Sequence, residues 1–379
     1  MRVALICPNS LPCPPIRSGA IELLLHRMAP YLARLGHQVT VFSIQDRSLP
    51  NREILNHVSY IRYPKARYIK EVSKYLKREF FDVIHIYNKF QWVKEIRKCS
   101  PKSRLVLSFH NLRLGHFADD EVSMEVINTV DHFVTVSQFV AKDMNTRYPA
   151  SSGKTTSLYT GEDPFRYIPH YSHEGQSITS YMKHRLGIPQ DYRIVLFVGR
   201  LVEYKGCHLL IQAMKNVQKH FPKTALVIVG SRWFGDKKMT DYINGLLKSA
   251  AKLKHFHFTN FIPVDQIPRI YTMSDILVCP SQWEEPLARV HYEAMAAGLP
   301  VVTSHRGGNP EIIRNGTNGF VVSRYNQSDE YAKAICQLLE KPQLCVKMGR
   351  ANRKLIEQRY NFKQYALNLS KLYKKIING

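Results

Sequence analysis

The chain has 379 residues, a length that predicts two domains rather than one. Hydrophobic residues make up 44% and charged residues 22%, a composition that excludes a disordered or fibrous protein. Lys and Arg number 54 against 30 Asp and Glu, and the formal net charge of +24 favours anionic partners such as phosphates, nucleic acid or an acidic membrane surface.

The seven cysteines are dispersed and form no C-x-x-C pair, which favours reduced thiols over a disulfide framework or a zinc site. No apolar run of the sequence is long enough to cross a membrane. The first run, residues 3–7, ends at Pro8 and is too short for the core of a signal peptide. We therefore expect a cytoplasmic protein.

Short apolar runs alternate with amphipathic stretches along the whole chain. The first half predicts strands at 2–7, 38–44, 57–63, 82–87, 104–110 and 132–137. The second half predicts strands at 193–199, 224–230, 255–261, 276–280, 300–304 and 319–322. Because these runs are almost continuously apolar, both faces of each strand are expected to be covered, as in parallel sheets with helical crossovers.

The pattern predicts an α/β fold with two facing, doubly wound, Rossmann-like domains. We expect an N-terminal domain at 1–165, a Pro- and Gly-containing linker at 166–190 and a C-terminal domain at 191–360. The amphipathic segment 361–377 is expected to pack back on the N-terminal domain. Ligands of such sheets bind outside the carboxyl ends of the strands, so a cleft between the domains is the expected site.

Two glutamates, Glu285 and Glu293, frame the most informative stretch. Pro286 predicts a helix start, which places Glu293 about 12 Å further along the axis. That separation is too long for a glycosidase pair and suits the two hydroxyl-rich ends of one elongated ligand. The alternative is that Glu285 compensates the helix dipole and Glu293 is solvated.

A second stretch runs from a strand through Arg200 and Lys205 to a helix start near Gly206. A guanidinium and an ammonium there could neutralise a diphosphate at the helix N-terminus, or the loop could simply be solvated.

Three weaker features also follow strands. Gly19 ends a loop in which backbone amides could meet an anion, but the loop lacks the G-x-G-x-x-G pattern of a dinucleotide site. His110 directly follows the apolar run 105–109, and a lone histidine is usually structural. The amides of Gly307 and Gly308 could face negative charge or form an ordinary turn. The sequence contains no D-x-D pair for a divalent metal, so no metal site is expected.

Taken together, these motifs resemble the retaining glycosyltransferases of family 4. The similarity lies in E-x7-E followed by E-A-M-A-x-G-x-P-V-V, in G-R-x4-K-G, and in the N-terminal landmarks S-F-H-N, T-V-S and Y-T-G-E-D. Residues 231–236 and 281–293 resemble, more narrowly, the glycosyltransferase-like spore coat proteins of bacilli. The resemblance implies the GT-B fold.

The resemblance also implies roles for single residues. Arg200 and Lys205 would bind the donor diphosphate, Glu293 the ribose and Glu285 the transferred sugar. The resemblance also implies that five further residues occupy catalytic or donor-binding positions: His110, Gly19, Leu287, Ala288 and Arg289.

The chain departs from the family pattern at three places. Ser18 replaces a glycine, Glu162 replaces an apolar residue, and Ala288-Arg289 replaces glycine and a small apolar residue. Arg289 would either add a charged contact to the donor or crowd the sugar pocket.

The resulting hypothesis is a metal-independent, retaining hexosyltransferase. It would move a sugar from a UDP- or GDP-linked donor to a hydroxyl during cell-surface or spore-coat glycan synthesis, with no other cofactor. A spore-coat structural protein that keeps the fold without turnover is the alternative, and no motif for specific nucleic-acid recognition occurs.

A basic region marks the acceptor side of this hypothesis. Residues 62–104 hold thirteen Lys or Arg against four acidic residues. They favour an anionic polymer, a lipid-linked glycan or a peripheral membrane contact, unless they are only a solvated helix face.

Overall fold

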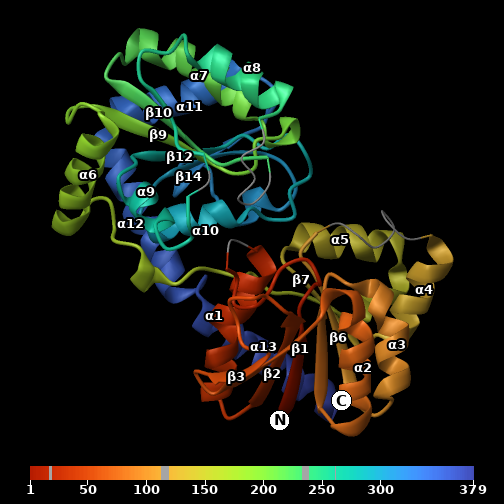
Figure 1. Ribbon diagram of the computed structural model, residues 1–379. Helices are drawn as coiled ribbons and strands as arrows, with labels where there is room; N and C mark the ends of the chain where they lie inside the picture. The colour runs from red at the N-terminus through yellow and green to blue at the C-terminus, as the bar shows by residue number, and fades with distance from the viewer. Residues whose placement is uncertain (17–18, 112–118, 233–238, 261) are drawn as a thin grey trace. The chain divides into compact units, whose positions relative to one another are not determined.

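The computed structural model describes residues 1–16, 19–111, 119–232, 239–260 and 262–379 (Figure 1). Ser18 and residues 233–236, which the sequence analysis singled out, lie outside these ranges. The chain divides into two compact units. The first comprises Met1–Thr160 and Phe362–Gly379, and the second comprises Gly161–Asn361.

The described residues of the first unit form an eight-stranded sheet in the order β3-β4-β2-β1-β5-β6-β7-β8. Its strands are β1 (Arg2–Ile6), β2 (Gln38–Ile44), β3 (Arg52–Leu55), β4 (Val58–Tyr63), β5 (Val83–Tyr87), β6 (Arg104–Phe109), β7 (His132–Thr135) and β8 (Thr155–Ser157). Its α-helices are α1 (Ala20–Arg34), α2 (Tyr68–Arg78), α3 (Val93–Cys99), α4 (Asp120–Thr129), α5 (Gln138–Arg147) and α13 (Phe362–Asn378). Short 3-10 turns are η1 (Lys65–Arg67), η2 (Phe90–Trp92) and η3 (Pro149–Lys154).

Two edge strands of this sheet were not predicted. Strand β3 is antiparallel to β4, with Arg52 opposite Ile61, and its side chains are mostly exposed. Strand β8 has three half-buried residues and, among the described residues, pairs with β7 alone. Neither carries an apolar run, because an edge strand is covered less than the central strands from which the predicted pattern comes.

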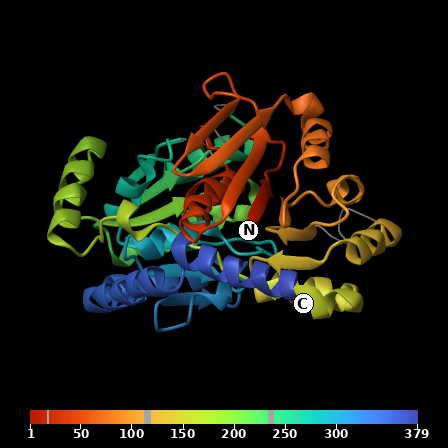
Figure 2. The ribbon, with the colours of Figure 1, turned by 90° about the horizontal axis from the view of Figure 1, so that it is seen from below.

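The core of the first unit lies between β1 and the helices α1 and α13. Val3 and Leu5 of β1, Leu24 and Met28 of α1 and Leu369 of α13 are all buried in one apolar cluster. Helix α13 packs along α1, and the two lie side by side in both ribbon views (Figures 1 and 2). The C-terminal segment is therefore part of the first unit's core.

The described residues of the second unit form a parallel six-stranded sheet in the order β11-β10-β9-β12-β13-β14. The strands are β9 (Arg193–Val198), β10 (Thr224–Val229), β11 (Phe256–Phe258), β12 (Ile276–Cys279), β13 (Val301–Ser304) and β14 (Gly319–Val322). The α-helices are α6 (His173–Leu186), α7 (Cys207–His220), α8 (Asp241–Ala250), α9 (Ile267–Thr272), α10 (Arg289–Ala296), α11 (Ser328–Glu340) and α12 (Pro342–Gln358). The 3-10 turns are η4 (Pro164–Arg166), η5 (Glu203–Lys205) and η6 (Asn309–Glu311).

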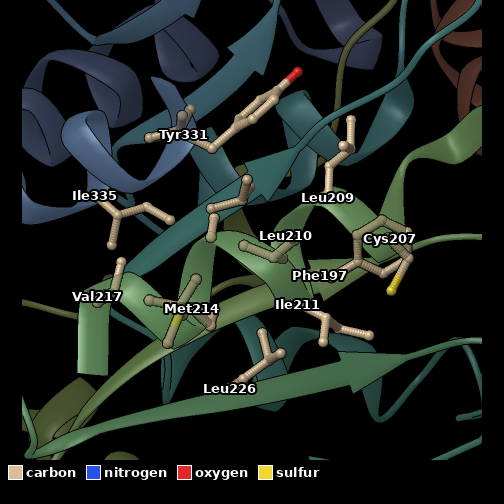
Figure 3. Close-up of a cluster of buried hydrophobic side chains, with 14 of the residues drawn as sticks. Phe197, Cys207, Leu209, Leu210, Ile211, Met214, Val217, Leu226, Tyr331 and Ile335 are labelled. Carbon is tan, nitrogen blue, oxygen red and sulfur yellow. The ribbon is translucent and has the colours of Figure 1, made fainter. Parts of the chain in front are cut away.

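Figure 3 shows part of the apolar core of this unit, where α7 packs against the sheet. Leu210 and Met214 of α7 are fully buried, as are Leu226 of β10 and Ile335 of α11. The strands are covered by apolar side chains, as the nearly continuous runs of Val, Ile and Leu predicted.

The expected linker at 166–190 is wrong in one respect, because most of it is helix α6 of the second unit. Ser172 caps this helix by accepting a hydrogen bond from the Gly175 amide at 3.0 Å, and Gly187 ends it in a left-handed conformation. A Cβ at Gly175 would lie 2.1 Å from the Pro169 carbonyl oxygen, so close packing requires this glycine. Residues that suggested a flexible segment are therefore caps and packing positions.

Helix α10 begins at Arg289 with Ala288 as its N-cap, so the predicted start at Pro286 is wrong. Glu285 lies in the loop before the helix, and helix-dipole compensation does not explain it. No helix among the described residues is long and apolar enough to span a membrane.

Candidate functional site

Strands β9 and β12 are neighbours in the second unit, and the chain order reverses between them. From β9 the chain continues outward to β10 and β11, whereas β12 leads to β13 and β14 on the other side. Arg200 and Lys205 follow the carboxyl end of β9, and Glu285 follows that of β12. Open α/β sheets bind ligands at this kind of switch point.

Lys205 and Glu285 meet directly across the two loops. The Lys205 Nζ lies 2.5 Å from the Glu285 Oε2, which also accepts hydrogen bonds from Ser281 Oγ at 2.9 Å and Trp283 Nε1 at 2.7 Å. Burial alone would raise the pKa of Glu285, but the Lys205 charge and these hydrogen bonds hold that pKa below its usual value. No described residue donates a hydrogen bond to the other oxygen, Oε1.

Two aromatic rings support the cations of this site, and the sequence analysis missed both. Tyr204 and Trp283 contact each other edge to face, with ring centroids 5.7 Å apart. The Arg200 guanidinium lies 5.5 Å from the Tyr204 ring centre, and the Lys205 ammonium lies 5.5 Å from that of Trp283. Cation–π contacts of this kind orient both positive groups. The signal available in the sequence was an aromatic residue within each charged motif.

Glycines at two positions let the loops approach each other. A Cβ on Gly206 would lie 2.0 Å from the Pro280 carbonyl oxygen, and one on Gly307 would lie 1.9 Å from the Glu285 carbonyl oxygen. Both residues also have positive φ angles, 71° and 56°. The position of the Glu285 loop therefore depends on Gly307.

The amides of Gly307 and Gly308 are engaged within the protein. Gly307 N donates to Glu284 Oε2 at 2.7 Å, and Gly308 N donates to the Glu285 carbonyl at 2.8 Å. Arg306 also pairs with Glu284 at 2.8 Å. The Gly307 amide therefore faces a carboxylate of the chain's own acidic loop, whereas the Gly308 amide forms a turn-like bond to a backbone carbonyl.

Glu293 lies on the second turn of α10 and is also held through one oxygen. Its Oε2 accepts a hydrogen bond from the Tyr271 hydroxyl at 2.7 Å. Its Oε1 lies 4.0 Å from Arg289 Nε, beyond hydrogen-bonding distance, and accepts no hydrogen bond from a described residue. Glu285 and Glu293 thus each have one fixed oxygen and one further acceptor.

The two unusual residues Glu162 and Arg289 contact each other. Arg289 Nη2 lies 2.6 Å from Glu162 Oε2, and the Glu162 side chain is completely buried. Burial raises the pKa of Glu162, an effect that the Arg289 charge opposes. Sequence patterns could not find this pair, because 127 positions separate the two residues.

The other predicted donor contacts lie beside this pair. Ala288 is buried, and its amide donates to Asn309 Oδ1 at 3.3 Å. Leu287 is half-buried just before it. Among the described residues, no group of three or more His, Cys, Asp or Glu side chains could hold a metal ion.

Gly19 and His110 belong to the first unit. Gly19 precedes α1 with a φ of 147°, and a Cβ there would lie 2.4 Å from the Glu22 carboxylate. Burial raises the pKa of Glu22 to about 7. His110 follows β6; its amide donates to Asn88 Oδ1 at 2.7 Å, and its ring lies 5.7 Å from that of Tyr87.

The two α/β units, each with a mostly or wholly parallel sheet, have the GT-B fold of glycosyltransferases. The family comparison agrees with this class. The profile "Glycosyltransferase Family 4" matches residues 21–166, and "Glycosyl transferases group 1" matches residues 181–355. The chain therefore belongs to the family 4 glycosyltransferases.

Individual proteins of known sequence or structure are also similar to this chain. Spore coat protein SA of Bacillus subtilis is 40% identical over 99% of this chain and 100% of its own length. The uncharacterized glycosyltransferase MJ1607 of Methanocaldococcus jannaschii is 30% identical, with 82% of each chain covered. The crystal structure of Anabaena Alr3699/HepE in complex with UDP-glucose superimposes with a TM-score of 0.78 at 22% identity, covering 99% of this chain and 100% of that one.

Proposed function

We propose that this protein transfers a hexose from a nucleoside diphosphate donor to an acceptor hydroxyl. The observation that carries the proposal is a pair of carboxylates that follow β12, Glu285 in the loop and Glu293 on helix α10. Each has one oxygen fixed by the protein and one that accepts no hydrogen bond from a described residue. Sugar hydroxyls are hydrogen-bond donors and suit such acceptors.

In this proposal Arg200 and Lys205 bind the donor diphosphate, Glu285 the transferred sugar and Glu293 the ribose. The aromatic contacts of both cations support this assignment, because they orient the charges before a ligand binds. Further donor contacts are assigned to Leu287, Ala288 and Arg289, and to Gly19 and His110 of the first unit.

The proposed reaction retains the anomeric configuration and uses no metal. The bond between the sugar C1 and the diphosphate oxygen breaks, and the acceptor oxygen bonds to C1 on the same face. The acceptor proton passes to an oxygen of the leaving diphosphate. Arg200 and Lys205 stabilise the charge that develops there, which is usually the largest catalytic contribution.

The donor is proposed to carry UDP or GDP, and the product to be a cell-surface or spore-coat glycan. The structurally similar HepE was crystallised with UDP-glucose, and the name of spore coat protein SA associates that relative with the spore coat. Both observations concern other proteins and support the proposal by similarity.

An anionic or lipid-linked acceptor is proposed to bind at helix α2 of the first unit. Its cations Lys70, Lys74, Lys77 and Arg78 are exposed. Sedimentation with vesicles of neutral lipid, with and without acidic lipid, tests a peripheral membrane contact. Binding that requires acidic lipid and weakens with salt supports it, and equal binding to both vesicles contradicts it.

A thermal-shift screen tests the donor site. UDP-glucose, GDP-mannose and ADP-glucose are each added in EDTA to the parent protein and to Arg200→Ala and Glu293→Ala. One donor should raise the Tm of the parent and not of either variant, because only a ligand of the folded site stabilises it. Lys223→Ala, which breaks an exposed pair with Asp191, is the control that should respond like the parent.

Product analysis tests the reaction itself. With the stabilising α-linked donor and a hydroxyl acceptor or water, NMR should show an α-anomer as the first product. A β-anomer would contradict retention. A donor that stabilises the protein but is never turned over would favour the non-catalytic spore-coat alternative.

A further inference from the structure

Arg289 lies between two carboxylates, those of Glu162 and Glu293. We propose that Glu162 is a positioning residue that holds Arg289 away from Glu293 and so keeps one Glu293 oxygen available to the donor. This inference rests on the proposed function, because it assigns that oxygen to the ribose.

The Arg289 guanidinium forms a hydrogen bond with Glu162 but not with Glu293. Arg289 Nη2 is 2.6 Å from Glu162 Oε2, a charge-assisted hydrogen bond. Arg289 Nε is 4.0 Å from Glu293 Oε1, which leaves attraction between the charges but no hydrogen bond. The guanidinium is therefore bound to one carboxylate and only near the other.

Glu162 is well suited to act as a fixed anchor. Its side chain is completely buried, and its Oε1 accepts a hydrogen bond from the Asp163 amide at 3.0 Å. Arg166 adds a second positive charge 3.8 Å from the same oxygen.

The backbone at this point is also fixed. Glu162 N donates to the Tyr360 carbonyl at 3.0 Å. A Cβ on the preceding Gly161 would lie 2.1 Å from that same carbonyl oxygen. The carboxylate that anchors Arg289 therefore has little room to move.

Glu293 is arranged to use the oxygen that Arg289 leaves open. The Tyr271 hydroxyl fixes its Oε2, which orients Oε1. If Glu162 lost its charge, Arg289 would be drawn to Glu293, at i and i+4 on the same helix, and would close to hydrogen-bonding distance. A charge-assisted bond is stronger than one from a neutral hydroxyl, so the guanidinium would displace a ribose hydroxyl from Oε1.

The test compares ribonucleotides with their 2′-deoxy and 3′-deoxy analogues. Calorimetry gives the Kd of UDP, GDP and ADP and of these analogues for the parent, Glu162→Gln and the double variant Glu162→Gln/Arg289→Gln. The parent should prefer one ribonucleotide to at least one of its deoxy analogues by about tenfold, as expected for one lost hydrogen bond to a charged group. Glu162→Gln should raise the Kd of the ribonucleotide about tenfold and leave the Kd of that deoxy analogue nearly unchanged, so the preference disappears.

The double variant separates positioning from a merely structural role. Removing the guanidinium as well should restore the preference for the ribonucleotide, whereas structural damage from the two substitutions would add. In turnover, Glu162→Gln should raise the donor KM about tenfold and change kcat less than twofold, since the reacting diphosphate is untouched. The control Arg193→Gln breaks a buried-carboxylate pair at the other edge of the sheet and should leave the preference intact.

The outcomes are distinguishable. A parent that shows the preference together with a Glu162→Gln protein that keeps it overturns this inference alone. A double variant that shows no preference for the ribonucleotide also overturns it. A parent that binds no nucleotide overturns the proposed function and this inference together.

Discussion

The second unit has an ion pair with a buried carboxylate at each edge of its sheet, and both pairs flank the same two strands, β9 and β12. At the amino edge, Arg193 opens β9 and pairs with Asp275, which directly precedes β12. At the carboxyl edge, Lys205 follows β9 and pairs with Glu285, which follows β12. The two carboxylates are similarly buried, although Arg193 is half exposed and Lys205 is mostly buried. The two clusters differ in whether a carboxylate oxygen is left without a hydrogen-bond donor among the described residues.

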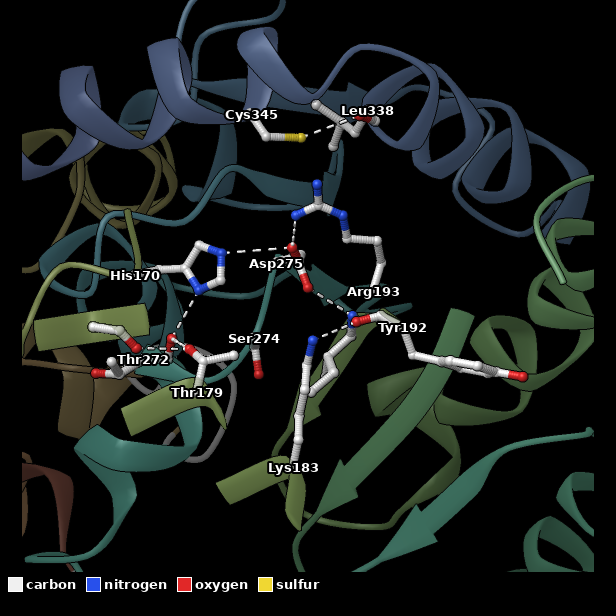
Figure 4. A network of polar contacts seen from close by, with 12 residues as sticks. His170, Thr179, Lys183, Tyr192, Arg193, Thr272, Ser274, Asp275, Leu338 and Cys345 are labelled. Atoms are coloured by element: carbon white, nitrogen blue, oxygen red, sulfur yellow. Dashed lines mark hydrogen bonds and ion pairs between the residues drawn. The ribbon is translucent and has the colours of Figure 1, made fainter. Parts of the chain in front are cut away.

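Both oxygens of Asp275 are occupied (Figure 4). Oδ1 lies 2.6 Å from Arg193 Nη1 and 3.5 Å from His170 Nε2, and Oδ2 accepts from the Ile194 amide at 2.8 Å. At the carboxyl edge, Glu285 concentrates three donors on one oxygen. A saturated carboxylate stabilises the fold, whereas one with an oxygen to spare can bind a ligand.

The largest expected effect is the loss of turnover in Lys205→Ala. Removing a group that stabilises developing charge costs about 10²–10³-fold in kcat, or about 2.7–4 kcal/mol. The measurement is steady-state transfer with the donor that stabilises the parent. Lys223→Ala removes a lysine from an exposed pair and should retain full activity. Equal activity in both variants would remove Lys205 from the site.

At the amino edge, Asp275→Asn should lower stability and leave donor binding unchanged. It leaves the Arg193 and His170 side chains without their anionic partner, which should lower the free energy of unfolding by about 3 kcal/mol. Urea unfolding measures this change. The Kd for the donor should stay within about twofold of the parent, since distant sites are usually independent. A Kd for the donor about tenfold higher than that of the parent would show that the two edges are coupled.

The pH dependence of stability should also single out the Asp275 cluster. Burial alone would raise the pKa of Asp275, but His170 and Arg193 lower it to about 2. Its stabilisation is therefore present above about pH 4 and is lost as pH falls towards 2, a loss of about 2.5 kcal/mol.

His170 acts in the opposite sense, since Asp275 raises its pKa despite burial. Its stabilisation is complete below about pH 6.5 and is lost as pH rises through the raised pKa. Urea unfolding at several pH values should thus show a maximum contribution between about pH 4 and 6.5. The Asp275→Asn protein should show neither the loss of stability at low pH nor the loss at high pH. An unchanged dependence of stability on pH in that variant would contradict this account.

The smallest predicted effect compares two glycines. Gly307 and Gly316 both have positive φ angles, but only a Cβ on Gly307 would meet another atom, the Glu285 carbonyl oxygen. Both alanine variants should lose about 1 kcal/mol of stability through backbone strain, and Gly307→Ala should lose more, because its Cβ would lie 1.9 Å from a backbone oxygen. Only Gly307→Ala should also lower the affinity for the donor, by about tenfold or 1.4 kcal/mol, because it displaces the Glu285 loop. Equal donor affinities would show that this loop tolerates the shift.

Much of the fold could be predicted from local patterns. The central strands of both sheets follow their apolar runs, as β2 at Gln38–Ile44 illustrates. The edge strands β3 and β8 could not be predicted, because half-exposed strands carry no such run. Helix α6 was mistaken for a linker, because its glycines and serine serve as caps and packing positions.

The candidate site could be predicted in its residues but not in its contacts. The motifs identify Lys205 and Glu285 separately, and only the adjacency of β9 and β12 brings them to 2.5 Å. Their assignment to a donor remains a prediction.

The sequence by itself determined the alternation of strands and helices, the family and the chemical types of the site residues. These depend on neighbours along the chain, where period and spacing carry the information. Only the tertiary structure decided that Glu162 pairs with Arg289 and which oxygens of Glu285 and Glu293 are occupied. Such pairings depend on which distant segments share a buried space, and in that space each charge requires a partner that no local pattern records.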